Sequence, residues 1–143
     1  MSESDYQHVM SILVKSGTYN DFMTAALIAS GAIASDFEVR MFCMNDAVWG
    51  LRKDVVGKDT LIQSHLPAYS EKLSDSLNEG KVVPWWDLLA QLKEFGDITI
   101  TVCALVADVL ELKKEDFHEL VDEVAGVASF AADVDDSDSV VTV

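Results

Sequence analysis

The sequence contains few of the residues that mark unusual protein classes. Its 143 residues include only two cysteines, two prolines and seven glycines. These counts exclude a disulfide-rich scaffold, a collagen-like repeat and a disordered chain rich in proline and glycine. Half of the residues are hydrophobic, so the chain can bury a core of ordinary size. We therefore expect one domain over residues 1–143, with residues 1–6 disordered.

Positive charge and long apolar runs are also scarce. Ten lysine and arginine residues stand against 25 aspartate and glutamate residues, and the formal net charge is −15. A field of this sign repels phosphate backbones, so nucleic acid is not an expected partner. The apolar run at 25–29 is far shorter than the roughly 20 residues of a membrane-spanning helix. No secretion signal opens the sequence, and we expect a cytoplasmic protein without a membrane span.

Several motifs of nucleotide, metal and hydrolase chemistry are missing. The loop at 15–20 holds one glycine and matches neither GxGxxG nor GxxxxGK[ST]. No two histidines are four residues apart, no GxSxG occurs, and the acidic stretch 133–138 lacks the order of a calcium loop. We expect that stretch to be a solvated loop. No metal and no cofactor are predicted, and a flavin held by loops alone is the alternative.

Apolar runs alternate with helical periodicity along the chain. Four runs are typical of buried strands, at residues 10–14, 37–44, 97–104 and 139–143. Six segments are typical of helices or helical turns, at residues 20–31, 47–53, 68–78, 84–96, 105–112 and 115–128. Thr18 or Asn20 can cap the first of these helices. Strands that alternate with helices predict an α/β fold, with a parallel sheet covered by helices on both faces.

Both cysteines lie at the ends of predicted strands, where ligands bind in parallel α/β sheets. Cys103 directly precedes a predicted helix, and the free N–H groups of a helix start would stabilise a thiolate there. The alternative is that Cys103 and Cys43 are small buried hydrophobes. Residues at the ends of the strands predicted at 10–14, 37–44 and 97–104 form the candidate pocket: Ser16, Gly17, Asn45, Trp49 and Ala104.

Segments over nearly the whole chain resemble the DsrE/DsrF-like sulfur-relay family. They are the alanine-rich stretch 24–34, residues 38–42, the WGLRK turn at 49–53, and residues 98–103, 112–117 and 124–130. The resemblance implies a flavodoxin-like α/β fold that a C-terminal strand closes, and a homo-oligomer that is a trimer or a hexamer.

The resemblance also implies a function for the cysteines. Cys103 matches the family's cysteine after the late strand, so it is the expected carrier of a persulfide. Cys43, which stands between Phe42 and Met44, is expected to pack or to take a secondary role, and the presence of a second cysteine also allows it to resolve the persulfide as a disulfide. The expected partner is a sulfur donor or acceptor protein, and the activity is that of a sulfur carrier or sulfurtransferase. The alternative is a non-catalytic homo-oligomeric module of the same fold that binds a small ligand or a protein.

Overall fold

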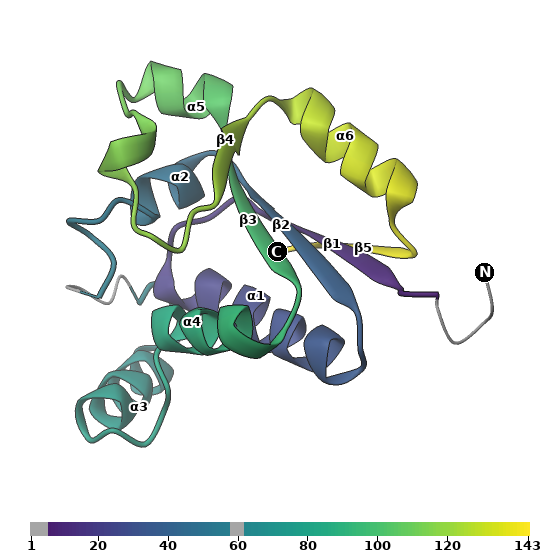
Figure 1. Cartoon of the computed structure of the whole chain (residues 1–143). Helices are drawn as coiled ribbons and strands as arrows, with labels where there is room; N and C mark the ends of the chain where they lie inside the picture. The colour runs from purple at the N-terminus through teal and green to yellow at the C-terminus, as the bar shows by residue number, and fades with distance from the viewer. Residues whose placement is uncertain (1–5, 58–61) are drawn as a thin grey trace.

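The computed structural model describes residues 6–57 and 62–143, and one parallel sheet organises them. The strands run in the order β4-β3-β2-β1-β5, and every neighbouring pair is parallel (Figure 1). Their bounds are β1 Val9–Val14, β2 Glu38–Cys43, β3 Ile98–Cys103, β4 Glu123–Ala125 and β5 Ser139–Thr142. Four of the five coincide with the predicted apolar runs, and the closing C-terminal strand is β5. The predicted α/β class is confirmed, and the fold is consistent with a flavodoxin-like one.

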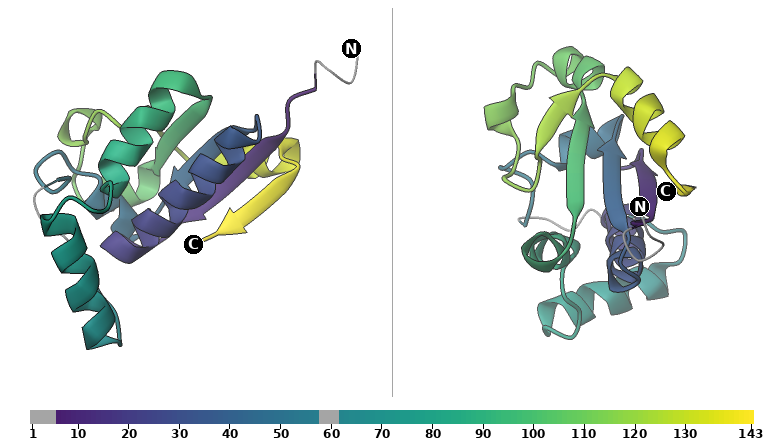
Figure 2. Two further views of the ribbon diagram at one scale, coloured as in Figure 1. Left: turned by 90° about the horizontal axis from the view of Figure 1, so that it is seen from below. Right: turned by 45° about the vertical axis from the view of Figure 1, so that its right-hand side comes forward.

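Helices cover the sheet on both faces. Their bounds are α1 Tyr19–Ala34, α2 Asp46–Gly50, α3 Pro67–Asn78, α4 Trp85–Phe95, α5 Ala104–Val109 and α6 Val127–Asp136. Helices α1 and α4 lie side by side on one face, and α5 and α6 lie on the other (Figure 1). Helix α3 projects away from the sheet, and β5 forms the edge beside β1 (Figure 2).

Small side chains allow α1 to pack closely on the sheet. Ala25, Ala26 and Ala29 of α1 are completely buried, and alanine is the best helix former. Thr18 caps the helix, because its side chain accepts a hydrogen bond from the backbone N–H of Asp21. Of the two residues that the sequence offers as caps, the structure uses Thr18.

The register of the sheet determines which side chains face which helices. The rings of Phe42 of β2 and Phe130 of α6 lie against each other, with their centroids 5.2 Å apart, so the even-numbered positions of β2 face α6. Because side chains alternate along a strand, Cys43 faces the layer of α1 and α4. Cys43 pairs with Val102, and paired residues of parallel strands share a face. Val102 therefore also faces α1 and α4, whereas Cys103, one residue further, faces α5 and α6.

The chain between α5 and α6 differs from the sequence prediction. The sequence predicts a helix over 115–128, but the structure has a short 3-10 helix at Lys114–Asp116 and then strand β4. Residues Phe117, Leu120 and Val121 are buried because the irregular segment docks on the end of α2, where the N–H of His118 donates to the carbonyl of Leu51 at 2.9 Å. Tertiary contacts, and not helical periodicity, therefore bury these residues, and the helix prediction is wrong.

Two further expectations concern the ends of the chain. Helix α6 continues to Asp136, so the predicted acidic loop at 133–138 is wrong for its first four residues. The expected disorder of residues 1–6 falls mostly on residues 1–5, which lie outside the described residues. Tyr6 is described, and its hydroxyl donates a hydrogen bond to Asp138 beside the start of β5.

Polar contacts hold α6 on the sheet. No residue of α6 is buried, although Phe130 packs against the core. The guanidinium of Arg40, on β2, pairs with Glu38 on its own strand and with two carboxylates of α6, Asp133 at 3.2 Å and Asp136 at 3.3 Å. The acidic end of α6 is therefore helical where it meets a positive charge.

Replacing Arg40 tests this attachment. Arg40→Met leaves three carboxylates without their cation, and we expect the free energy of unfolding to fall by about 1–3 kcal/mol. Urea denaturation followed by circular dichroism measures the change. Lys81→Met is the matched control, because Lys81 pairs with Glu79 in a highly exposed ion pair whose loss costs about 0.5 kcal/mol or less. Equal losses in the two variants would contradict the assigned role of Arg40.

Candidate functional site

The C-terminal ends of β1, β2 and β3 meet at one edge of the sheet, here called the carboxyl edge (Figure 1). The loop at 15–18 leaves β1 there, α2 follows β2 there, and α5 begins directly after Cys103. Both cysteines are therefore at the carboxyl edge, as the sequence predicts.

A close approach of two backbones shapes this edge. A Cβ on Gly17 would lie 2.4 Å from the carbonyl oxygen of Asp46, the first residue of α2. Asn45, just before α2, adopts φ 53°, a region that asparagine tolerates better than most residues. The loop after β1 and the start of α2 are thus locked together by backbone contact.

Cys43 is inaccessible in this arrangement. It is completely buried, and burial raises the pKa of its thiol to about 12, because a thiolate loses its hydration in an apolar environment. The Cys43 thiol is therefore protonated at neutral pH and is a poor nucleophile.

Cys103 has a different environment. It is 3% exposed, pairs with Ala125 of β4 and occupies the N-cap position of α5, where its side chain makes no capping hydrogen bond. It faces the layer of α5 and α6, opposite to Cys43. The register therefore places the two thiols on different faces of the sheet and does not bring them together.

The five residues of the predicted pocket lie around the carboxyl edge but not in one cavity. Ser16 lines an open polar cavity of about 640 Å³ together with Thr18, whereas Gly17 lines a separate small cavity beside Tyr19. Asn45 and Ala104 flank the starts of α2 and α5. The fifth residue, Trp49, is 42% exposed. The guanidinium of Arg52 lies over its ring, 3.7 Å from the ring centroid.

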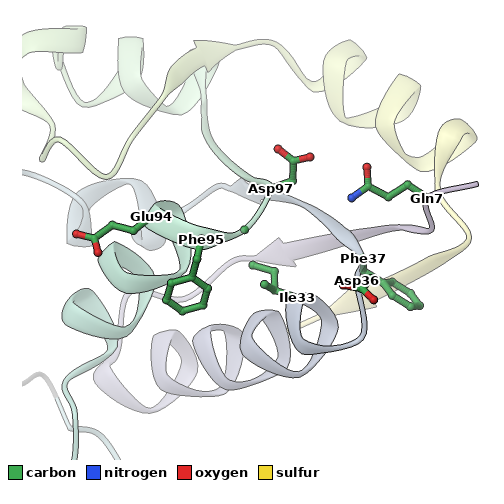
Figure 3. A pocket seen from close by; sticks show the side chains of 8 residues that line it. Gln7, Ile33, Asp36, Phe37, Glu94, Phe95 and Asp97 are labelled. Carbon is green, nitrogen blue, oxygen red and sulfur yellow. The ribbon is translucent and has the colours of Figure 1, made fainter. Parts of the chain in front are cut away.

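A cavity that the sequence motifs do not indicate lies at the opposite edge of the sheet. It measures about 470 Å³ and lies between the ends of α1 and α4, where Figure 3 shows Ile33 between Phe95 and Phe37. Three carboxylates line it, and Phe95 is 70% exposed. The strand β3 separates it from Cys103 by about 20 Å, at 3.3 Å per residue. In the sequence, this place is indicated only by the predicted ends of the two helices that border it.

Residues 6–57 and 62–143 contain neither a candidate metal centre nor a candidate membrane span. No group of three or more histidine, cysteine, aspartate or glutamate side chains in these ranges is placed to hold a metal ion. None of the helices in these ranges has the length and apolar character that a membrane crossing requires.

Comparisons with known proteins give a family and a fold. The model of the DsrE/DsrF-like family matches residues 8–143. Among solved structures, a protein of unknown function from Methanobacterium thermoautotrophicum is similar, with a TM-score of 0.63 and 12% sequence identity over 96% of this chain and 100% of that one. No curated protein matches the sequence.

The backbone contact at Gly17 gives a testable prediction. Gly17→Ala forces a methyl group against the Asp46 carbonyl, and we expect it to lower the free energy of unfolding by about 1–3 kcal/mol. Gly31→Ala is the matched control, because a Cβ there meets nothing within 4 Å and an alanine within a helix stabilises it by about 0.5–1 kcal/mol. Denaturant titration of both variants measures the difference, and a neutral Gly17→Ala would refute the close approach.

Proposed function

Because the chain belongs to the DsrE/DsrF-like family, we propose that it is a sulfur-relay protein that carries sulfane sulfur as a persulfide on Cys103. The observation that carries this proposal is the position of Cys103 at the carboxyl edge, as the last residue of β3 and the N-cap of α5. Sulfur relay requires a cysteine that a second protein can reach, and the carboxyl edge is where α/β proteins bind their ligands.

The contrast between the two cysteines supports the choice of Cys103. Cys43 is enclosed beneath α1 and α4, and burial holds its pKa near 12. Cys103 lies at a junction of strand and helix, as the last residue of β3 and the N-cap of the six-residue helix α5. The register also places the side chains of Cys43 and Cys103 on opposite faces of the sheet, which argues against a disulfide between the two cysteines. The proposal therefore assigns no resolving role to Cys43.

The chemistry balances without an external oxidant. The Cys103 thiolate attacks the outer sulfur of a donor persulfide, so that a bond forms from Cys103 to this sulfur while the donor's own S–S bond breaks and a donor thiolate leaves. An acceptor thiolate then attacks the outer sulfur of the Cys103 persulfide. A bond forms from the acceptor to this sulfur, the S–S bond to Cys103 breaks, and Cys103 is released as a thiolate. Sulfane sulfur moves as a unit, and neither step needs a metal or a cofactor.

Exposed apolar side chains lie on the two helices that follow Cys103 and its register partner in the chain. Leu105 and Val109 of α5 are 71% and 72% exposed, and Val127 at the start of α6 is 55% exposed. Leu105 lies two residues after Cys103. Val127 lies two residues after Ala125, which pairs with Cys103 in the sheet. Exposed apolar groups beside a reactive group favour a protein as the donor or acceptor. A cytoplasmic location, where thiols stay reduced, is part of the proposal.

We expect the protein to be a homo-oligomer with closed symmetry, a trimer or a hexamer. Several helices and strands expose apolar side chains, and contact with another copy of the chain would bury them. The family resemblance implies the same assembly. Sedimentation velocity at micromolar concentration measures the state. A 15.7 kDa species as the sole component would refute this prediction.

The alternative function is a non-catalytic module that binds a small ligand or a protein. The polar cavity beside Ser16 favours it, because its volume of about 640 Å³ falls within the range of small-molecule sites. In that case both cysteines are packing residues, and the cavity lined by Ser16, Thr18 and Asn20 holds the ligand.

Intact mass after treatment with a sulfane-sulfur donor decides between the two functions. We expect the wild-type protein to gain roughly 32 Da, the mass of one sulfur atom, and a reductant to remove it. Cys43→Ala should keep the adduct and Cys103→Ala should lose it, because Cys103 occupies the N-cap of α5, whereas the Cys43 thiol is completely buried and its pKa is raised to about 12.

The same variants provide the contrary outcomes. An adduct that persists in Cys103→Ala and disappears in Cys43→Ala would reassign the carrier to Cys43. The binding module becomes the better reading if no variant gains sulfur and both thiols resist alkylation until the protein unfolds.

A further inference from the structure

The outer side of β5 is an open edge of the sheet. In the described part of the chain, β5 pairs with β1 and no further strand lies beyond it (Figure 2). Such an edge presents unpaired N–H and C=O groups that a further strand can bind. Natural sheets protect their edges with charged side chains, proline or very short strands. Strand β5 contains neither proline nor a charged residue, although 24% of the whole chain is charged.

The edge formed by β4 is protected in contrast. Strand β4 spans only Glu123–Ala125, and its first residue is an exposed glutamate. A short length and a charged side chain are two of the devices that prevent pairing at an edge. Of the two edges of the sheet, β5 is therefore the one that can accept a further strand.

Hydrogen bonds with β1 show which backbone groups of β5 point outward. The N–H of Val143 donates to the carbonyl of Leu13, and the N–H of Lys15 donates to the carbonyl of Val143. The backbone of Val143 therefore faces β1. Backbone groups point alternately to the two sides of a strand, and the register of β5 against β1 is uninterrupted. The N–H and C=O groups of Val140 and Thr142 consequently point to the open side.

The side chains of the same two residues are uncovered as well. Val140 is 45% exposed, and Thr142 is also exposed. Both lie on the face of the sheet that carries α6, because Val140 is in register with Ser11, and Ser11 with Arg40. Exposed β-branched side chains beside unpaired backbone groups are the parts from which a further strand pairing is built.

This edge is complementary to a second copy of itself. When two β5 strands run antiparallel about a two-fold axis at Val141, Val140 of each copy lies opposite Thr142 of the other. The outward N–H and C=O groups of these residues then pair reciprocally, as in an ordinary antiparallel ladder. Their side chains meet on the same face as β-branched cross-strand pairs, which stabilise sheets.

The charges at the two ends of β5 favour the same antiparallel arrangement. The strand begins directly after an acidic stretch that includes Asp135, Asp136 and Asp138. It ends beside Lys15, whose N–H donates to Val143. Antiparallel pairing brings the acidic start of each β5 towards the lysine of the other copy, whereas parallel pairing would place the two acidic starts together.

We propose that β5 is an interface with a second copy of this chain, in which two sheets join edge to edge through antiparallel β5 strands. A contact of this kind is isologous, so it joins chains or trimers in pairs. Of the two assemblies expected above, it selects the hexamer, as two trimers joined through β5. The interface does not involve Cys103 and does not rest on the sulfur-relay proposal.

A cysteine at position 141 tests the pairing directly. The two copies of residue 141 form a non-hydrogen-bonded pair, with Cα atoms about 4.5 Å apart, which is within the range of a disulfide. We expect oxidised glutathione to cross-link most of the Val141→Cys chains into dimers that a reductant separates, as a non-reducing gel shows. The variant also carries Cys103→Ala, so that this native thiol takes no part.

Thr142→Cys in the same background is the matched control. Residue 142 is exposed, whereas residue 141 is half-buried, so random collisions would favour cross-linking at 142. In the proposed register the two copies of residue 142 are diagonal neighbours, about 7–8 Å apart, which is too far for a disulfide. We therefore expect Thr142→Cys to stay largely free of cross-links.

Sedimentation velocity measures the assembly without cross-linking. Val140→Lys places a charge on the edge, as protected edge strands do, and we expect it to halve the mass of the assembly. Val83→Lys makes the same substitution at a valine that is 52% exposed and precedes α4, so it should keep the wild-type mass. Circular dichroism confirms that each variant is folded.

Three results would overturn the proposal. The first is a wild-type protein that sediments as a monomer or a trimer, and the second is a Val140→Lys variant that keeps the wild-type mass. The third is cross-linking at position 142 that equals or exceeds that at position 141. Sulfur transfer to Cys103 is measured separately by intact mass, so failure of this interface is distinguishable from failure of the sulfur-relay proposal.

Discussion

Helix α6 is attached to the sheet by charge more than by burial, and its ion pairs with the sheet come from Arg40. Its guanidinium binds one carboxylate on β2 and two on α6, while α6 itself buries no residue. Helix α6 leads directly into β5, which pairs with β1 and closes the sheet. In a chain with a net charge of −15, one cation in this position allows an acidic segment to fold against the strands instead of being repelled from them.

Much of the fold follows from local patterns. The runs at 10–14, 97–104 and 139–143 predict the strands β1, β3 and β5, because parallel strands buried between helices need continuous apolar and β-branched runs. The spacing of residues 117–128 satisfies a helix equally well, and the structure breaks it because Phe117 bridges to Arg52 and β4 completes the sheet. Contacts this distant in sequence leave no local periodicity. The acidic residues of α6 were likewise unpredictable, because the cation that they meet is far away along the chain.

The candidate site was predictable in position but not in geometry. Strand ends place Cys43 and Cys103 at the carboxyl edge, yet only the register of β2 against β3 reveals that their side chains face opposite layers. The structure also explains two separate segments that resemble the family. The stretch at 49–53 and the stretch at 112–117 lie side by side, since the N–H of Lys53 donates to the carbonyl of Asp116 at 3.0 Å. Together they form one supporting unit behind the carboxyl edge.

The placement of one thiol in each layer has a consequence for the motions of the protein. Cys43 is completely buried and faces the layer of α1 and α4, so we expect it to meet solvent only when that layer opens. Cys103 is the N-cap of the short helix α5, so we expect an opening confined to the start of α5 to uncover it. The energies of local and global opening differ widely in folded proteins. The chain therefore carries two natural probes of its native-state dynamics, one for each scale of opening.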